Sequence, residues 1–225
     1  MNAGFRVLKR RRAVDAATID KFRSLPVANI SDCMNRMAAG GPRLRPLHDS
    51  AVLCGAAITV KTRPGDNLMV HMALNLVGPG DVIVVDAGGD LTNSIVGERM
   101  LAHAEAKGCA GIVIDGAVRD YGYIKGRKFP VYAAGVSHRG PYKDGPGEVN
   151  VTIALDGMVI EPGDLVIGDE DGLLCVPFDH VATVYALALA KHVSEMAEFP
   201  QIAAGTADRS NWVKRLRQLG CEFEE

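Results

Sequence analysis

The sequence predicts an α/β fold with a central parallel sheet, a second barrel-like sheet and flanking helices. The central sheet is indicated by three buried strands, within 81–90, 110–115 and 130–135, and a helical pattern over 93–108 separates the first two. Continuous apolar strands separated by a helix are typical of parallel strands that are covered on both faces. The second sheet is indicated by residues 150–177, in which short apolar runs are separated by Asp-Gly and Pro-Gly-Asp turns. Closely spaced turns of this kind favour antiparallel or barrel-like pairing.

The region before the central sheet predicts helices and then a strand. Apolar residues lie three and four positions apart in 17–25 and again in 27–37, which is the helical period. Gly40-Gly41-Pro42 ends this region. Residues 51–62 read as a strand, with Gly55 as a bulge or bend.

Further helices are indicated on either side of the charged and turn-rich segments. Residues 64–67 predict a turn that ends in a helix N-cap, and a helix follows until Gly78-Pro79-Gly80. After the second sheet we expect a long helix over roughly 178–198 and a shorter one near 209–219.

Length and charge limit the class of protein. The chain has 225 residues and a net charge of −2, so it can bury a sizeable core and has no general attraction to nucleic acid or anionic membrane. We expect a single domain over 1–225, with an N-terminal arm and helix over 1–24 and a C-terminal tail over 199–225. The basic run Lys9–Arg12 reads as a solvated arm.

The cysteines and the apolar runs indicate the compartment. The five cysteines include no CxxC pair, and Cys54, Cys109 and Cys175 lie in apolar or Ala/Gly-rich surroundings typical of small core residues. This favours a reducing compartment. No apolar run reaches the ~18 residues that a membrane span needs, and the N-terminus lacks the apolar core of a signal peptide. We therefore expect a cytoplasmic protein.

Two loops that follow predicted central strands carry ionisable side chains. The first contains Asp86 and Asp90 and continues to Gly97, Glu98, Arg99 and Met100, and the second contains Asp115, Arg119 and Asp120. Because ligands bind at the carboxyl ends of parallel strands, we expect these groups around one crevice. A single carboxylate with water in the other positions suits Mg²⁺, and a guanidinium beside it suits a carboxylate or an enolate oxygen. The alternative is that Arg119 and Asp120 form a surface ion pair that caps a short helix.

The spacing of these charges adds a resemblance. Glu98 is followed by twenty residues and then by the pair Arg119-Asp120. An acidic residue, twenty residues and Arg-Asp is the signature of the class II pyruvate aldolases that cleave 4-hydroxy-4-methyl-2-oxoglutarate. The sequence resembles this family from about residue 25 to 200, in "PGDNL" (64–68), "VVDAGGDLTNSIVGE" (84–98), "GIVIDGAVRD" (111–120) and, more faintly, "PGDLVIGDEDG" (162–172). The same superfamily includes the regulator of ribonuclease E activity A, in which the Arg-Asp pair is not kept intact; this sequence keeps it.

The resemblance implies a fold and a set of residue roles. The fold would be a swivelling β/β/α-type domain, assembled as a homotrimer or as a hexamer of two trimers with sites between subunits. Asp120 would be the direct ligand of Mg²⁺ or Mn²⁺, and Arg119 would contact the keto or enolate oxygen of the substrate. The pyruvoyl group would be lined by Gly97, Glu98, Arg99 and Met100, whose backbone N–H groups would meet its carboxylate at a helix start, and Asn67 would add a side-chain hydrogen bond.

Two carboxylates are implied as further catalytic groups. Glu98 would hold a metal-bound water; it replaces an aspartate of the characterised aldolases and is one methylene longer. The other carboxylate would come from a late helix of a neighbouring subunit. Glu195 extends the stripe of Val181, Val184, Ala188 and His192 at helical spacing and is our candidate. Glu198 is the alternative, and a solvated helix end is the non-functional interpretation of Glu195.

The implied activity is that of a divalent-metal-dependent class II aldolase. It would cleave 4-hydroxy-4-methyl-2-oxoglutarate, or a related 4-hydroxy-2-keto acid, to pyruvate by retro-aldol chemistry, and it would also decarboxylate oxaloacetate. Its partner would be a small-molecule 2-keto acid, with no membrane or nucleic-acid partner expected. Two alternatives stay open: a non-catalytic regulator that binds and inhibits an RNA-processing ribonuclease, and a lyase for a different 2-keto acid such as a sugar-derived one.

The histidines and the glycine-rich segments indicate no further chemistry. The six histidines show no HxxxH or HxH pairing, and we expect His71 and His103 to be packing or surface residues. The glycine-rich segments 78–81 and 87–90 match neither GxGxxG nor a Walker loop, so nucleotide binding is not expected.

Overall fold

The structure of the protein is a computed structural model that describes residues 3–38 and 40–224. The chain forms two compact units, one that ends at Ala188 and one that begins at Leu189. The first unit contains the sheets and the charged loops, and the second contains helical segments only. The boundary falls inside a long helix, Val181–Ala203. The expectation of one domain over 1–225 therefore stays a prediction.

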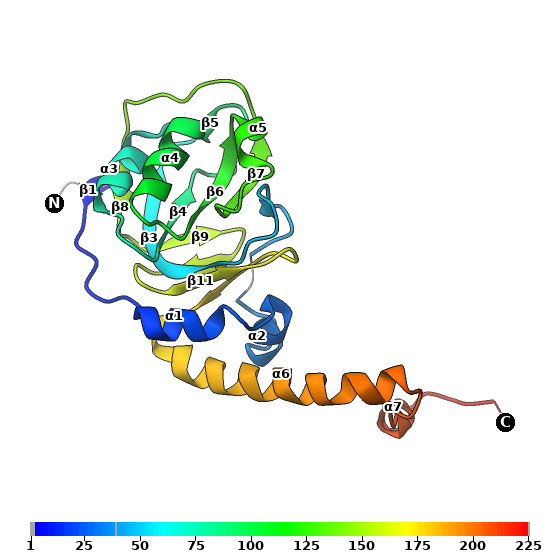
Figure 1. The fold of residues 1–225 in the computed structure, drawn as a ribbon. Helices are drawn as coiled ribbons and strands as arrows, with labels where there is room; N and C mark the ends of the chain where they lie inside the picture. Colours follow the sequence, from blue (N-terminus) through cyan, green and yellow to red (C-terminus); the bar gives the residue numbers. More distant parts are fainter. Residues whose placement is uncertain (1–2, 39, 225) are drawn as a thin grey trace. The chain divides into compact units, whose positions relative to one another are not determined.

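One sheet dominates the first unit (Figure 1). Its strands in the described residues are β1 (Phe5–Val7), β2 (Arg45–Pro46), β3 (Leu53–Thr62), β4 (Asp81–Asp86), β5 (Ser94–Val96), β6 (Gly111–Val118), β7 (Val131–Val136), β8 (Gly147–Val149), β11 (Leu165–Gly168) and β12 (Leu173–Val176). The main order is β1-β8-β3-β4-β6-β7-β2, with β5 beside β6 and with β11 and β12 attached to β3. Strands β3, β4, β6 and β7 pair in parallel. The predicted parallel core is confirmed.

The turn-rich segment that follows is antiparallel, as expected, but it divides between two sheets. Strands β11 and β12 pair antiparallel with each other, and β11 pairs antiparallel with β3, so both belong to the main sheet. Only β9 (Ile153–Leu155) and β10 (Met158–Ile160) form a small second sheet among the described residues. The fold is therefore a mixed α/β architecture with a large, mostly parallel sheet and a small second one.

The helices of the described residues are α1 (Ala16–Phe22), α2 (Val27–Cys33), α3 (Leu68–Leu76), α4 (Glu98–Ala106), α5 (Tyr121–Ile124), the 3₁₀ helix η1 (Phe178–His180), α6 (Val181–Ala203) and α7 (Ser210–Gln218). Helix α2 ends four residues before the predicted limit, because Asn35 and Arg36 adopt positive φ angles of 56° and 61°. No helix in the described part of the chain has the length and apolar character needed to cross a bilayer.

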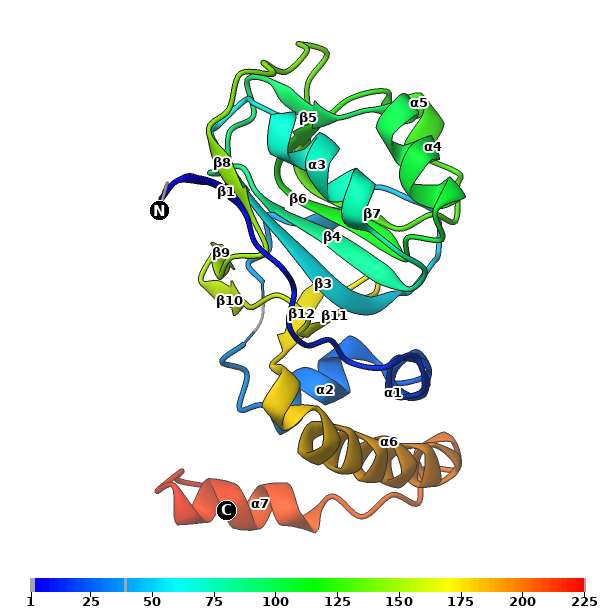
Figure 2. The ribbon, with the colours of Figure 1, turned by 90° about the vertical axis from the view of Figure 1, so that its left-hand side faces the viewer.

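Both faces of the central strands are buried, which explains their continuous apolar sequences. Successive side chains of a strand point to opposite faces. In β4, Ile83 and Val85 belong to the core cluster formed with α3 and α4, whereas Val82 and Val84 belong to the cluster formed with β9 and β10. Figure 2 shows α3 and α4 lying over one face of the sheet. A third cluster packs α1, α2 and the first turns of α6 against β11 and β12.

The helix predicted over 93–108 is wrong in its first part. Residues Ser94–Val96 form strand β5, which pairs in parallel with the end of β6, and α4 begins only at Glu98. The β-branched pair Ile95-Val96 is buried there and favours the strand. Gly97 is the residue between β5 and α4, with an extended backbone (φ −147°, ψ −174°). This correction puts the start of α4 directly beside the Arg119-Asp120 loop.

Candidate active site

The Arg119-Asp120 pair lies against the N-terminus of α4. The Arg119 N–H donates to the Val96 carbonyl at 2.9 Å, which extends the β5–β6 pairing by one residue. The Asp120 Oδ2 accepts a hydrogen bond from the Glu98 N–H at 2.8 Å. Two residues that lie 22 positions apart in sequence are thereby joined, and the spacing noted in the sequence becomes a contact.

Asp120 is held in an unusual backbone conformation. Its φ and ψ are 57° and 42°, the left-handed region that a residue with a Cβ rarely adopts, and it is the residue before α5. Its carboxylate makes no capping hydrogen bond to α5. The ion pair of the alternative interpretation is present, but the capping of the short helix α5 is wrong, because the carboxylate binds the first N–H of α4 instead. Strained backbone of this kind is often found at functional sites.

Gly97 is required by the close approach of these two loops. A Cβ at this position would overlap the Asp120 carboxylate and would lie 2.8 Å from Arg119 Cγ. Its φ is one that any residue can adopt, so space alone excludes a side chain here. The Arg119 Nε lies 3.7 Å from Asp120 Oδ2, and the two side chains are 44% and 41% exposed. The Arg119 backbone and the Asp120 carboxylate are thus each held by a hydrogen bond, while both side chains stay partly exposed to solvent.

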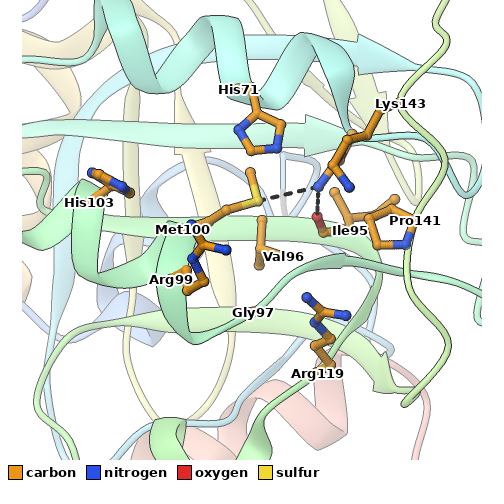
Figure 3. A pocket seen from close by; sticks show the side chains of 11 residues that line it. His71, Ile95, Val96, Gly97, Arg99, Met100, His103, Arg119, Pro141 and Lys143 are labelled. Carbon is orange, nitrogen blue, oxygen red and sulfur yellow. Dashed lines mark hydrogen bonds between the residues drawn. The ribbon is translucent and has the colours of Figure 1, made fainter.

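A pocket of about 310 Å³ opens beside this pair (Figure 3). This volume is at the lower end of the range for small-molecule sites. Five of the six residues predicted to bind substrate line it, and Glu98 does not. Asp120 also does not line it, but its carboxylate binds the backbone N–H of Glu98, between the lining residues Gly97 and Arg99. The lining residues are Asn67, His71, Ile95, Val96, Gly97, Arg99, Met100, His103, Arg119, Pro141 and Lys143.

Two of the four backbone N–H groups from Gly97 to Met100 are occupied. The Glu98 N–H binds Asp120, and the Met100 N–H binds the Gly97 carbonyl at 3.0 Å. Among the described residues, the Arg99 N–H has no partner. The Gly97 N–H likewise has no partner among the described residues. A ligand carboxylate could therefore meet two free N–H groups, those of Gly97 and Arg99, where the sequence predicted a cradle of four from Gly97 to Met100.

Asn67 lies between α3 and α4 and is 2% exposed. Its Nδ2 donates to the Ile95 carbonyl at 2.9 Å and to Met100 Sδ at 3.3 Å. Its Oδ1 is buried and accepts no hydrogen bond in the described part of the chain. Because Nδ2 is engaged, only the buried Oδ1 is left as an acceptor, so the hydrogen bond predicted to a substrate would need a donor such as a hydroxyl that reaches this atom.

Asp66, and not Asn67, caps α3. The Asp66 Oδ1 accepts from the Leu68 N–H at 2.9 Å, whereas Asn67 makes no capping hydrogen bond. The Asp66 Oδ2 accepts from the N–H groups of Asp144 and Gly145 at 2.7 and 2.9 Å. One fully buried carboxylate thus fixes both the start of α3 and the loop that carries Lys143.

Asp86, Asp90 and Asp115 do not line the pocket. Asp86 and Asp115 are neighbours across β4 and β6. Asp115 is 4% exposed, and its Oδ1 lies 2.8 Å from Arg43 Nη2 without accepting a hydrogen bond of good geometry from any described residue. Burial raises the pKa of the Asp115 carboxyl, and the charge of Arg43 opposes that rise. The expectation of one crevice holds for the Gly97–Met100 part of the first loop, which contacts Asp120 and lines the pocket with Arg119. It is wrong for Asp86, Asp90 and Asp115, which do not line the pocket; Asp115 lies within β6, whereas Arg119 and Asp120 follow its end.

Asp120 fits the ligand chemistry of a hard divalent cation. Its carboxylate is partly exposed, and one oxygen is oriented by the Glu98 N–H. Mg²⁺ is commonly bound through one or two carboxylates while it keeps several waters. In the residues that the structure describes, no group of three or more histidine, cysteine or carboxylate side chains is arranged to hold a metal.

Glu195 lies on α6 in the second compact unit. Its Oε1 is 2.7 Å from Lys191 Nζ, one helical turn away. The alternative candidate, Glu198, is exposed on the same helix. A role for either carboxylate at the site of a neighbouring subunit stays a prediction.

Six pocket residues were not predicted from the sequence as site residues, and three of them are ionisable: His71, His103 and Lys143. His71 and His103 are exposed, in agreement with the surface position expected for them. The usable signal was their spacing from predicted site residues. His71 follows Asn67 by one helical turn, and His103 follows Arg99 by one turn, so each pair shares a helix face.

The chain is similar to known proteins over most of its length. The model of the family "RraA-like: Aldolase/RraA" matches residues 27–175. A protein of Halalkalibacterium halodurans named "Putative 4-hydroxy-4-methyl-2-oxoglutarate aldolase" is 38% identical over 179 residues, which cover 80% of this chain and 85% of the relative. A 4-hydroxy-4-methyl-2-oxoglutarate aldolase of Thermus thermophilus is 37% identical over 112 residues, which cover 50% and 68% of the two chains.

A solved structure described as the RNA-processing inhibitor RraA from Thermus thermophilis superposes with a TM-score of 0.63 at 31% identity. The match covers 68% of this chain and 92% of that one. The resemblance read from the motifs is confirmed by these matches, which extend over most of the first unit. The chain belongs to the RraA-like family.

Proposed function

We propose that this protein is a divalent-metal-dependent lyase that cleaves 4-hydroxy-4-methyl-2-oxoglutarate, or a related 4-hydroxy-2-keto acid, to pyruvate. The observation that carries the proposal is the joint position of Arg119 and Asp120 on the start of α4, beside a small pocket with basic walls. The names of the aldolase relatives support the same reaction class.

In this proposal, Asp120 holds Mg²⁺ or Mn²⁺, and the Glu98 N–H orients its carboxylate. When bound, the cation supplies Lewis-acid polarisation of the substrate's keto group. The enzyme is expected to assemble as a homotrimer or hexamer, which would bring a carboxylate of α6 from a neighbouring subunit to the site.

Arg119 stabilises the charge that forms during bond cleavage. The C3–C4 bond of the substrate breaks, the C4 hydroxyl becomes a ketone, and the electron pair moves onto the pyruvoyl half as an enolate. A guanidinium presents a planar set of donors that suits this oxygen. The base of Arg119 is fixed by the Val96 carbonyl while its side chain stays partly exposed, so its tip can meet a ligand in the pocket. Donors aimed at developing charge are among the largest contributors to catalysis.

The remaining carboxylates, Glu98 and Glu195 of a neighbouring subunit, serve proton transfer in this proposal. The C4 hydroxyl loses its proton as the bond breaks, and C3 of the enolate gains one to give the methyl group of pyruvate. Glu98 is exposed beside the pocket and can accept the hydroxyl proton, directly or through water, together with the predicted Glu195 of a neighbouring subunit. The methyl substrate yields two pyruvates. Oxaloacetate would lose CO₂ through the same enolate, so decarboxylation should accompany aldol cleavage.

The test is a pyruvate-release assay with 4-hydroxy-4-methyl-2-oxoglutarate and with oxaloacetate. The protein is treated with EDTA, dialysed, and then titrated with Mg²⁺ or Mn²⁺. We expect release from both substrates that is lost with EDTA and restored by the cation. Undiminished turnover after complete metal removal contradicts the proposed chemistry.

A second candidate function is a non-catalytic regulator of an RNA-processing ribonuclease, and the likeness to the RraA structure supports it. The pocket and the intact Arg119-Asp120 pair favour the lyase, because a binding protein has no use for an enolate-stabilising pair. Specific pull-down of a purified ribonuclease, together with no turnover of any 2-keto acid, would favour the regulator.

A further inference from the structure

Three turns of the first unit share the pattern X-Pro-Gly-Asp, at residues 63–66, 78–81 and 161–164. In each turn the aspartate N–H donates to the carbonyl of the residue before proline, at 3.0, 3.2 and 3.1 Å in chain order. The glycines have positive φ angles of 75°, 81° and 93°, as a type II turn requires. The three aspartates, Asp66, Asp81 and Asp164, are all buried. The three turns therefore have the same local structure.

In two of these turns the aspartate carboxylate binds its own turn. Asp81 Oδ2 accepts a hydrogen bond from the Gly78 N–H at 3.0 Å, and Asp164 Oδ2 accepts one from the Glu161 N–H at 2.8 Å. Gly78 and Glu161 are the first residues of their turns. Local bonds of this kind, from a short side chain to nearby backbone, are common for aspartate.

Asp66 departs from this pattern. The N–H of Arg63, the first residue of its turn, donates to the Pro146 carbonyl at 3.3 Å instead. The Asp66 Oδ2 accepts from the N–H groups of Asp144 and Gly145, which lie 78 and 79 positions away in sequence. Asp66 is 0% exposed, and hydrogen bonds to a charged group are stronger than those between neutral groups. The carboxylate therefore holds a distant loop where its two counterparts hold their own turns.

The loop that Asp66 holds, residues 140–146, forms one wall of the pocket. Pro141 and Lys143 lie in this loop and line the pocket (Figure 3). Tyr142, between them, pairs with the segment before α3. Its N–H donates to the Gly65 carbonyl at 2.8 Å, and its carbonyl accepts from the Asn67 N–H at 3.0 Å. The wall is thus joined to the segment before α3 by backbone bonds and by the buried carboxylate.

The same loop lies close to the guanidinium of Arg119. A Cβ on Gly140 would be 3.4 Å from Arg119 Nη1. The backbone of Arg119 and the carboxylate of Asp120, in contrast, are held by β5 and by the start of α4, without any contact to Asp66. Asp66 therefore acts on one wall of the pocket but does not hold the groups that take part in bond cleavage.

We propose that Asp66 is a positioning residue of the pocket, which holds the 140–146 loop in place and thereby sets the affinity for the substrate. The inference rests on the proposed function, in which the keto acid binds in this pocket. It assigns Asp66 a role that Asp81 and Asp164 lack, because the groups that bind their carboxylates lie outside the pocket. Substrate affinity and bond cleavage then depend on separate anchors.

The substitution Asp66→Asn tests this role, and Asp164→Asn is the matched control. Each of the two carboxylates accepts backbone N–H groups through both of its oxygens. An asparagine has one oxygen, and its NH₂ group would face a backbone N–H, so both variants should lose stability to a similar extent. Urea unfolding measures this loss and shows that each variant is folded.

Steady-state kinetics with 4-hydroxy-4-methyl-2-oxoglutarate separate positioning from a general loss of stability. We expect KM to rise about 10-fold or more in Asp66→Asn while kcat stays within about 3-fold of the parent value, because binding is lost and the cleavage groups are kept. Asp164→Asn should keep the parent KM and kcat.

Amide hydrogen exchange, followed by mass spectrometry, examines the loop without a substrate. We expect faster exchange over residues 140–146 in Asp66→Asn than in the parent or in Asp164→Asn. If Asp66→Asn does not fold, Arg63→Met replaces it. This variant removes a guanidinium that lies 3.3 Å from Asp66 Oδ2, and it should raise KM by about 2- to 3-fold, with faster exchange in the same loop.

The positioning role and the proposed function fail in different ways. Unchanged exchange in the loop contradicts the positioning role, and so does an unchanged KM in Asp66→Asn or an equal rise of KM in Asp164→Asn. A parent protein that turns over no keto acid contradicts the proposed function. The exchange of the loop, which needs no ligand, then still decides whether Asp66 holds this wall.

Discussion

The Asp120 carboxylate accepts a hydrogen bond from the backbone N–H of Glu98 at 2.8 Å, across a contact that leaves no room for a side chain at Gly97. This contact fastens the loop after β6 to the start of α4. It also gives the Arg-Asp pair its position, because Arg119 is anchored in the same place by the Val96 carbonyl. Substitutions at Asp120, Arg119 and Gly97 can separate the structural role of this contact from the chemical role of the Asp120 and Arg119 side chains.

The substitution Asp120→Asn keeps an acceptor for the Glu98 N–H but removes the negative charge of the side chain. The amide oxygen can still accept from the Glu98 N–H, so the fold should be retained, but a neutral amide is a poor ligand for Mg²⁺. We expect keto-acid cleavage to fall by about 10² or more, as for the loss of a charge-stabilising element. Steady-state kinetics with Mn²⁺ binding followed by electron paramagnetic resonance provide the measurement. Asp20→Asn, at an exposed carboxylate on α1, is the matched control and should bind Mn²⁺ like the parent.

Arg119→Ala removes the donor that faces the developing enolate. We expect kcat to fall by about 10² or more, with a smaller change in KM, because the interaction is stronger in the transition state. Arg119→Lys keeps the charge but loses the planar fork, and it should recover only part of the rate. Kinetics on oxaloacetate and on the hydroxy keto acid are the measurement. Parent-like kcat in Arg119→Ala would exclude this role.

Gly97→Ala tests the close approach directly. The added methyl would overlap the Asp120 carboxylate and would lie 2.8 Å from Arg119 Cγ, so the side chains of Asp120 and Arg119 must move from their positions. We expect a large loss of kcat with the protein still folded, because small displacements of catalytic groups cost rate steeply. Gly122→Ala is the control, since a Cβ there meets no atom within 4 Å. Equal activity of the two variants would show that the position of the loop is unimportant.

Arg43→Met tests the buried carboxylate outside the pocket. Burial raises the pKa of Asp115 and Arg43 opposes the rise, so the variant should raise that pKa further. A carboxyl whose folded pKa lies above its unfolded value of about 3.9 loses its stabilising contribution as the pH rises through the folded pKa. We expect the free energy of unfolding at pH 7 to fall by about 1–3 kcal/mol.

This deficit should narrow as the pH is lowered, because protonation of Asp115 removes the buried charge that Arg43 opposes in the parent protein. Urea unfolding at a neutral, an intermediate and an acidic pH measures it. Arg36→Met, which breaks an exposed Arg-Asp pair on the surface, should cost less than about 1 kcal/mol. A deficit of constant size across this pH range would show that Asp115 is not the group involved.

The central sheet could be predicted from the sequence because its signals are local: apolar runs such as the one in β4 identify buried strands. The proximity of Glu98 to the Arg-Asp pair was expected from the positions of the two loops after predicted strands and from the family resemblance, and the structure shows it as a hydrogen bond. Strand β5 was missed because three residues are too few to show a period, and its apolar pair Ile95-Val96 also fits a helix. The start of α4 was therefore placed too early.

The rest of the pocket depends on contacts between distant segments. Lys143 reaches it only because buried Asp66 binds the backbone of the loop that carries it. Asp115 was misplaced because it belongs to β6 itself, where it pairs with Arg43, while Arg119 and Asp120 follow the strand end. The position of a residue along a strand can be read from the sequence. The residues that it contacts belong to segments far away in the sequence, so those contacts cannot be read from it.

The most direct measurement of the central claim is the exchange of the methyl protons of pyruvate in D₂O, followed by proton NMR. Exchange requires the pyruvate enolate and no carbon–carbon cleavage, so it isolates the charge that Arg119 and a cation on Asp120 are proposed to stabilise. The account predicts rapid exchange with Mg²⁺, and loss of exchange in EDTA and in Asp120→Asn. Exchange that is equally fast in EDTA and in Asp120→Asn would contradict it.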